Sequence, residues 1–195
     1  KPVNPNQILL SLKKILDHKS LIADKTVFNY QKQFSEISNS LIDLKNYEDW
    51  IEYFKKLIYW DLELESLEDP SMLGIFKTQM QEANIQFSKF IENNYENWME
   101  SNKGPTFSHQ VFEKFVFPEL KSHKPCLLLM IDNLRYDQWK TILPETKEYY
   151  KIESEKTYFS ILPTATQYAR NSFFAGLTPL EISNRYPQWW RNDTD

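Results

Sequence analysis

Apolar residues that recur every three or four positions are the feature that most constrains the fold of this chain. One such stripe runs through residues 27–44, a second through 47–58 and a third through 76–98. This spacing places the apolar side chains on one face of an α-helix. The acidic stretch from Glu63 to Pro70 separates the last two stripes, because proline removes a backbone donor and restricts the residue before it. The pattern predicts three helices with short connections, packed as a three-helix bundle.

A shorter amphipathic run, Gln7 to Asp17, precedes these stripes and predicts a further helix with one apolar face. A helix of that length is marginal in water, so it is expected to pack against another part of the protein. The aromatic residues of the longer stripes would suit a ligand groove, but their helical spacing favours core packing.

The composition excludes several classes of protein. Only three of 195 residues are glycine, which argues against a sheet rich in tight turns and against a glycine-rich nucleotide loop. The net charge of -4 provides no positive field for coating a nucleic acid. A single cysteine, Cys126, excludes an intrachain disulfide and a cysteine-based zinc cluster. No apolar run approaches the roughly 18 residues that span a bilayer and no signal peptide opens the chain, so the expected location is the cytoplasm.

The pattern changes after a polar break at residues 101–106. The continuous apolar run Cys126 to Ile131 predicts a strand buried on both faces, and Lys151 to Ile161 predicts a second strand. Residues Thr164 to Ala175 predict a turn into a helix that ends at the next glycine. Strand, helix, strand, helix is the start of an α/β domain. Two strands are few for an open sheet, so this domain is expected to be cut at Asp195.

Two polar positions follow these predicted strands. Asp132 ends the first strand, where ligands bind in open α/β sheets; a carboxylate there holds a metal, activates a hydroxyl or caps the next helix. Thr166 lies where the second strand leads into a helix, and free backbone N–H groups at such a helix start favour a phosphate. Considered alone, Thr164 or Thr166 is better explained as the N-cap of that helix. Since both positions follow strands, Asp132 and Thr166 are expected to meet and share a metal.

The same segments resemble a known family. Pro163-Thr164-Ala165-Thr166, followed by Ala175-Gly176-Leu177-Thr178-Pro179, resembles the nucleophile segment of the alkaline phosphatase superfamily. Together with the segment Ile131 to Trp139, it is similar to the PglZ domain. Over the whole chain the resemblance is to the PorX-like response regulators of Bacteroidetes, in which a receiver domain, a helical bundle and a PglZ domain follow in that order.

This resemblance implies an α fold followed by an α/β fold. Residues 1–18 would be the C-terminal end of a receiver domain, with Lys1 as its signalling lysine. Residues 19–106 would form the helical bundle, and residues 107–195 the truncated N-terminal part of an alkaline-phosphatase-like domain.

The resemblance also implies a two-zinc phosphodiesterase or phosphatase. Thr166 would be the nucleophile, with Thr164 as the alternative, and Asp132 would bind one zinc ion together with Thr166. The threonine alkoxide would attack in line, and water on the second zinc ion would hydrolyse the phosphoenzyme. Asn133 and Arg170 would hydrogen-bond the substrate phosphate, unless Arg170 pairs with an acidic neighbour.

The three histidines, His18, His109 and His123, all precede Asp132, and none has the spacing of a metal-binding pair. Each is expected to be a surface or packing histidine. The superfamily completes its metal sites with later Asp and His ligands, so this chain alone is expected to be inactive.

The partners implied by the resemblance are a sensor histidine kinase, which acts on the receiver, and a nucleotide or oligonucleotide phosphodiester as substrate. Homodimerisation, no association with a membrane, and regulation of type IX secretion or gliding are also implied. The alternative is a non-catalytic PglZ-fold signalling module that binds a partner such as a sigma factor. The tail at residues 185–191, with two adjacent tryptophans beside arginines, would either stack on a nucleobase or pack into a core.

Overall fold

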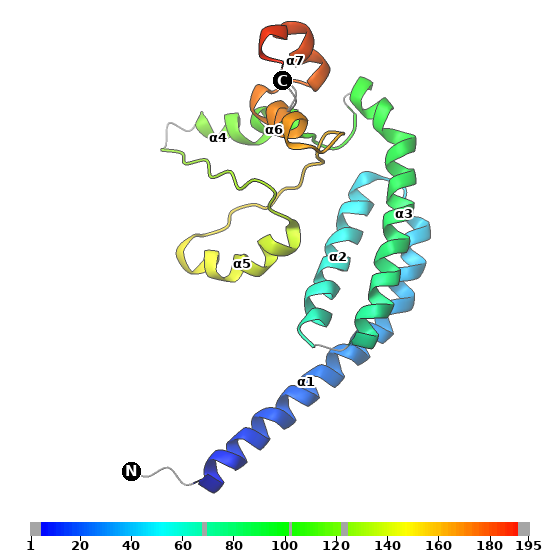
Figure 1. Cartoon of the computed structure of the whole chain (residues 1–195), viewed down its shortest axis with the longest axis vertical. Coiled ribbons are helices and arrows are strands. Elements are labelled where there is room, and N and C mark those ends of the chain that lie inside the picture. Colours follow the sequence, from blue (N-terminus) through cyan, green and yellow to red (C-terminus); the bar gives the residue numbers. More distant parts are fainter. Residues whose placement is uncertain (1–4, 68–69, 102, 122–124, 191–195) are drawn as a thin grey trace. The chain divides into compact units, whose positions relative to one another are not determined.

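The computed structural model describes residues 5–67, 70–101, 103–121 and 125–190 (Figure 1). Within them the helices are α1 (Pro5–Ser40), α2 (Tyr47–Glu65), α3 (Pro70–Ser101), α4 (Phe117–Leu120), α5 (Tyr136–Tyr149), α6 (Thr166–Ala175) and α7 (Pro179–Arg185). Short 3-10 or π turns accompany them, namely η1 (Leu41–Asp43), η2 (Ser108–Gln110), η3 (Phe112–Val116) and η4 (Pro187–Trp189). The chain forms two compact units. The first, called the helical unit here, contains the residues up to Tyr95 and Arg135–Thr141; the second contains Glu96–Leu134 and the residues from Ile142 onward.

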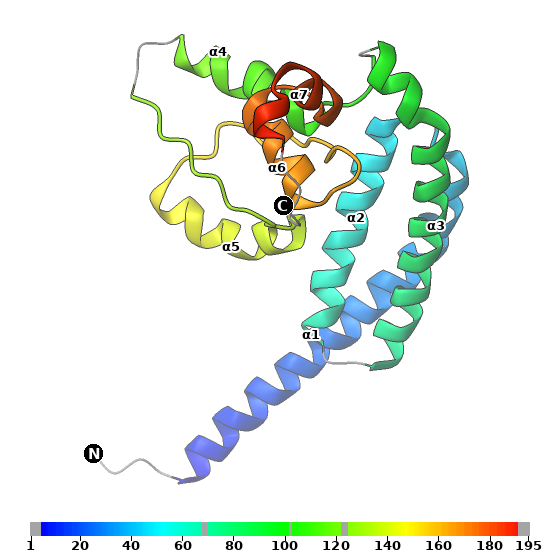
Figure 2. The same cartoon turned by 45° about the horizontal axis from the view of Figure 1, so that its top comes forward.

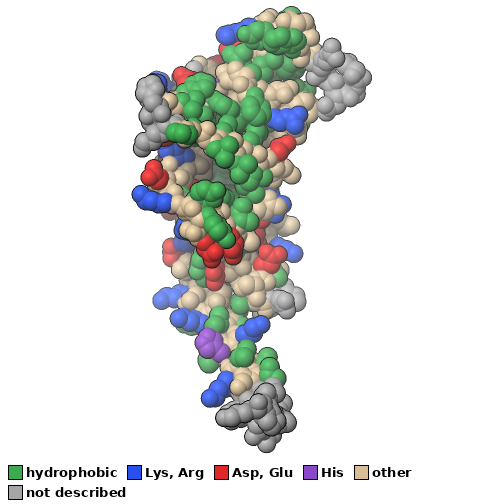
Figure 3. Space-filling model, turned by 90° about the vertical axis from the view of Figure 1, so that its left-hand side faces the viewer, with side chains coloured by type: hydrophobic (Ala, Val, Ile, Leu, Met, Phe, Trp, Pro, Cys, Tyr) green, Lys and Arg blue, Asp and Glu red, His purple; other side chains and the backbone are tan. Residues whose placement is uncertain are grey.

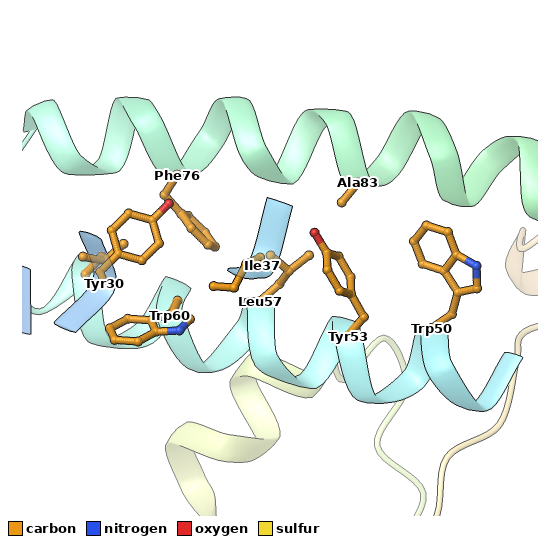
Figure 4. Packing of buried hydrophobic residues seen from close by; sticks show 9 residues of the cluster. Tyr30, Ile37, Trp50, Tyr53, Leu57, Trp60, Phe76 and Ala83 are labelled. Atoms are coloured by element: carbon orange, nitrogen blue, oxygen red, sulfur yellow. The ribbon is translucent and has the colours of Figure 1, made fainter. Parts of the chain in front are cut away.

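The three predicted amphipathic stripes form α1, α2 and α3, and this helical part of the fold prediction is confirmed. The apolar faces of these helices meet in one core. Figure 4 shows its side chains packed between α2 and α3. The buried members are Tyr30, Ile37, Trp50, Tyr53, Leu57, Trp60, Leu64, Phe76 and Ala83. Helix α2 begins with a capping box, in which Asn46 Oδ1 accepts from Asp49 N at 2.8 Å and Asp49 Oδ2 accepts from Asn46 N at 3.3 Å.

Helix α1 is one continuous helix of 36 residues, whereas the sequence predicted a separate helix at Gln7–Asp17 as part of a receiver remnant. Residues 18–26 contain neither proline nor glycine, so nothing in the local sequence ends the helix there. Figures 1 and 2 show α1 extending past the ends of α2 and α3, and Leu12, Ile15 and Leu16 on that extension are exposed. The structure therefore does not confirm a receiver remnant at residues 1–18. Among the described residues, no helix has both the length and the apolar character that crossing a membrane requires.

Within the second unit, a short parallel β-bridge pairs Phe107 with Phe159. Ser108 N donates to Phe159 O at 3.1 Å, and Phe159 N donates to Thr106 O at 2.8 Å. Two residues further on, Ile161 N donates to the buried hydroxyl of Ser108 at 3.1 Å. Helix α6 packs against η2 beside this bridge. The bridge therefore fixes the segment that leads into α6.

The predicted strands at Cys126–Ile131 and Lys151–Ile161 are not confirmed, because the described residues contain no strand. A strand needs a neighbouring strand whose backbone N–H and C=O groups pair with its own. Among the described residues, the pairing of this kind that the structure contains is the single bridge between Phe107 and Phe159. The apolar run is exposed instead, with Leu127 at 91% and Leu129 at 78% of full exposure. Figure 3 shows hydrophobic side chains gathered at the surface on one face of the molecule. An apolar run without a partner has no basis for forming a strand.

Candidate functional site

Asp132 lies in a turn at residues 132–133, directly after the apolar run. Asn133, the second residue of this turn, has a positive φ of 57°. Asparagine is one of the few side chains that adopt this left-handed conformation readily, because its short amide bonds locally. The asparagine at position 133 therefore allows the chain to turn sharply immediately after Asp132. Because α5 begins only at Tyr136, Asp132 is not its N-cap, and the capping alternative for Asp132 is wrong.

Thr166 is the first residue of α6, and Ala165 is the N-cap with no side-chain hydrogen bond. The alternative that Thr164 or Thr166 caps this helix is therefore wrong. Tyr168 N and Ala169 N both donate to Ala165 O, at 3.0 and 2.9 Å. The backbone N–H groups of Thr166 and of the next residue come before Tyr168 in the chain. Within the helix they have no carbonyl group to which they can donate. They lie at the positive end of the helix dipole, which favours an anion such as a phosphate.

Arg170 joins these two segments. Its Nη1 lies 3.8 Å from Oδ2 of Asp132, and the two side chains are 50% and 60% exposed. An exposed pair at this distance adds little stability. The ion pair matters for the geometry of the site. Arg170 lies one helical turn after Thr166, so its contact with Asp132 places the Asp132 turn beside α6. The acidic neighbour considered for Arg170 in the sequence is thus Asp132 itself.

Sequence reasoning missed Tyr158, which also belongs to this region. Burial raises the pKa of its phenol, and the negative charge of Asp132 raises it further. Its ring lies 6.0 Å from that of Phe173 on α6. Tyr158 precedes the bridge residue Phe159, and this place near the end of the second predicted strand was the one signal in the sequence that pointed to it.

The predicted signalling lysine and the three histidines, which were expected to be surface or packing residues, lie elsewhere or outside the described part. Lys1 and His123 are outside the described residues. His18 is exposed on α1. His109 stacks on Phe107 with ring centroids 6.3 Å apart, and burial lowers its pKa.

The donors present account for only part of a metal site. The carboxylate of Asp132 and the hydroxyl of Thr166 are oxygen ligands of the kind that zinc accepts. A zinc site needs at least three protein ligands, and no group of three or more His, Cys, Asp or Glu side chains suited to a metal gathers within the described ranges. By their chemistry these two residues could supply at most two ligands of such a site, and a metal shared by Asp132 and Thr166 stays a prediction.

Comparison with protein families assigns both parts of the chain. Residues 20–99 match the PorX response regulator linker domain, and residues 111–194 match the BREX system PglZ alkaline phosphatase-like domain. A comparison with curated proteins gave no match. The first match spans most of α1, α2 and α3, and the second contains Asp132, Thr166 and Arg170. The chain therefore belongs to the PorX-like proteins, in which a response regulator linker domain is followed by a PglZ alkaline phosphatase-like domain.

Proposed function

We propose that this chain is part of a response regulator whose effector is a metal-dependent phosphodiesterase or phosphatase that uses Thr166 as its nucleophile. The linker and PglZ matches support a regulator with a phosphatase-like effector. One observation supports the site in particular: the contact between Arg170 and Asp132 brings a carboxylate beside the helix that begins at Thr166.

The chemistry of the proposed site follows from these residues. The Thr166 hydroxyl gives up its proton to solvent, Oγ1 attacks phosphorus in line as the bond to the leaving oxygen breaks, and the leaving oxygen takes up a proton. Water then hydrolyses the phosphothreonine, which restores the threonine and releases the phosphate product. A bound divalent cation, zinc in the resemblance, would lower the pKa of the hydroxyl and neutralise charge on the phosphoryl oxygens. The guanidinium of Arg170, the Asn133 amide and the free backbone amides at the start of α6 hold the non-bridging oxygens.

The proposed architecture keeps an α/β domain for residues 107–195, with Cys126–Ile131 as one of its strands. Residues 19–106 are the linker bundle, and residues 1–18 are the end of a receiver domain. A linker domain of response regulators supports a sensor histidine kinase as the upstream partner. Regulation of type IX secretion or gliding from the cytoplasm is the proposed cellular role.

The test is hydrolysis of bis(p-nitrophenyl) phosphate by the zinc-loaded full-length response regulator that contains this chain, and by its variants. Thr166→Ala and Asp132→Ala are expected to lower kcat/KM by about a thousandfold or more. Thr164→Ala is the matched control, because it removes a threonine hydroxyl two residues before Thr166. This variant should retain activity. Loss of activity in Thr164→Ala with retention in Thr166→Ala would transfer the nucleophile to Thr164.

The second candidate is a non-catalytic PglZ-fold module that binds a partner such as a sigma factor. One observation favours it: no group of three or more metal-ligating side chains gathers among the described residues. Absence of zinc-dependent turnover in the native protein, with intact binding of a sigma factor, would establish this candidate over the enzyme.

A further inference from the structure

The proposed nucleophile shares one face of α6 with two other side chains of the second unit. Arg170 and Phe173 follow Thr166 by four and seven residues, so the three side chains lie along one side of the helix. At the helical rise per residue, Arg170 lies about 6 Å and Phe173 about 10 Å beyond Thr166 along the axis. Thr166 and Arg170 are exposed, whereas Phe173 is only 9% exposed. This face of α6 is therefore open at its beginning and covered at its end.

Tyr158 packs where this face becomes covered. Its ring lies 6.0 Å from that of Phe173, with 52° between the planes. Phe173 is supported in turn by Phe112, whose ring lies 5.3 Å away at an angle of 79°. Tyr158 itself is 49% exposed. One part of its side chain is therefore held by the aromatic cluster, and the rest is open to solvent beside the α6 face.

The backbone next to Tyr158 is held on both sides. The following residue, Phe159, donates from its N–H to Thr106 O at 2.8 Å and accepts from Ser108 N at 3.1 Å. The ring of Phe159 stacks on that of Trp98, with centroids 6.4 Å apart. Successive side chains of an extended segment point to opposite sides, so Tyr158 is directed away from this stack and toward α6. A ring that is already held in place loses little conformational freedom when a ligand stacks on it.

Charged groups that suit a phosphate lie in the same region. Arg170 Nη1 is 3.8 Å from Asp132 Oδ2. Burial, and after it the charge of Asp132, raises the pKa of Tyr158. The phenol therefore stays uncharged at neutral pH and does not repel an anionic ligand. A cation, a carboxylate and a partly open aromatic ring thus lie together in the second unit.

We propose that Tyr158 is a specificity-determining residue that stacks on a planar ring carried by the phosphodiester substrate, such as the base of a nucleoside ester. The phosphate lies at Thr166 and Arg170, and the ring lies further along the same face of α6, against Tyr158. Stacking on an aromatic side chain is tolerant of sequence because every base has a π-face, so Tyr158 selects for a ring and not for a particular base. This inference rests on the proposed function, since it takes Thr166 and Arg170 as the phosphate end of the site.

The test compares two phosphodiesters that share a p-nitrophenyl leaving group, with the zinc-loaded full-length response regulator that contains this chain. The second ester group is thymidine in one and methyl in the other. Tyr158→Leu keeps an apolar side chain against Phe173 but removes the ring. It should lower kcat/KM for the thymidine ester by about tenfold or more, mainly through KM, and leave the methyl ester unchanged. Tyr158→Phe should keep the native preference, because the ring remains.

An equal fall for both esters, or no fall for the thymidine ester, would overturn the proposal. Tyr149→Leu is the matched control, since Tyr149 is a 79% exposed ring at the end of α5, and it should change neither rate. If Tyr158→Leu loses the native circular dichroism spectrum, Tyr158→Met replaces it with the same two outcomes, because methionine adapts to irregular packing.

A binding measurement separates failure of this inference from failure of the proposed function. If the native regulator hydrolyses neither ester, the proposed function fails. Thymidine 5′-monophosphate and deoxyribose 5-phosphate, which differ by the base, are then titrated into the metal-free regulator by calorimetry. Tighter binding of the nucleotide by about tenfold, lost in Tyr158→Leu, keeps the ring subsite, whereas equal affinities for the two compounds overturn it.

Discussion

The phenol of Tyr30 in α1 donates a hydrogen bond to Oε1 of Gln79 in α3, with 3.0 Å between the two oxygens. The amide nitrogen of Gln79 donates to Phe34 O at 3.2 Å and to Ser38 Oγ at 2.8 Å. Tyr30 is 1% exposed and Gln79 is 6% exposed, so these bonds lie inside the bundle core. They hold α1 in one register against α3, because a shifted register would leave buried polar groups without partners.

Removing the phenolic hydroxyl of Tyr30 should therefore lower the stability of the bundle. Tyr30→Phe leaves Gln79 Oε1 buried without its donor, and we expect the free energy of unfolding to fall by about 1–3 kcal/mol. Tyr59→Phe is the control, since Tyr59 is 54% exposed and should change stability by less than about 0.5 kcal/mol. Urea denaturation followed by circular dichroism measures both. Equal stabilities of the two variants would contradict a structural role for the Tyr30 bond.

The bundle should lose stability at alkaline pH. Burial raises the pKa of Tyr30 to about 12, with a smaller contribution from Tyr53, and burial also raises the pKa of Tyr53 to about 12. In the unfolded chain both phenols titrate near their ordinary value of about 10. Below pH 10 both states keep the proton and the full stability is present. Between pH 10 and 12 the unfolded state alone releases it, so unfolding becomes easier by about 1.4 kcal/mol per pH unit for each tyrosine.

Urea denaturation at a series of pH values from 8 to 11 measures this loss. The double variant Tyr30→Phe, Tyr53→Phe is the control, because it should have a shallower decline above pH 10 than the native chain. If the native chain and the double variant declined in parallel, lysine and surface tyrosine titration would be responsible and the assignment to the two buried phenols would be wrong.

Two glycines are expected to respond to the same substitution in opposite directions. A Cβ at Gly104 would stand 2.6 Å from Trp98 Cβ and 2.8 Å from Trp98 Cδ1, and Trp98 is only 9% exposed. Gly104→Ala should therefore cost about 1–3 kcal/mol through overpacking. A Cβ at Gly74 in α3 meets nothing within 4 Å, so Gly74→Ala should stabilise its helix by about 0.5–1 kcal/mol. Differential scanning calorimetry distinguishes them, and a rise in Tm for Gly104→Ala would refute the close contact.

Arg170 should act on phosphate binding. Arg170→Ala is expected to lower kcat/KM about a hundredfold, since it removes a charge-assisted donor from the phosphoryl oxygens, and Arg170→Lys should recover part of that loss. Arg185→Ala is the matched control, because Arg185 pairs with Glu181 on α7 at 3.2 Å. Inhibition by orthovanadate should weaken in parallel with activity. Full activity and full vanadate affinity in Arg170→Ala would show that its role is limited to the Asp132 ion pair.

The helices could be predicted from the sequence because their hydrogen bonds join residues four apart. The stripes at 27–44, 47–58 and 76–98 contain the spacing that α1, α2 and α3 need, and the left-handed Gly176 ends α6 where the sequence predicted a stop. The resemblance of the Asp132 and Thr166 segments was equally local, and the family matches confirm it.

Contacts between distant residues were decided by the tertiary structure. Whether Cys126–Ile131 forms a strand depends on a partner elsewhere in sequence, and an apolar run carries no information about that partner. The meeting of Arg170 with Asp132, the charge of Asp132 acting on Tyr158 and the contact of Tyr136 with Phe54 each join residues more than 20 positions apart. Short-range periodicity therefore determined which segments are helical, whereas the candidate site arises from the folding of the chain, because its groups become neighbours only when distant segments pack.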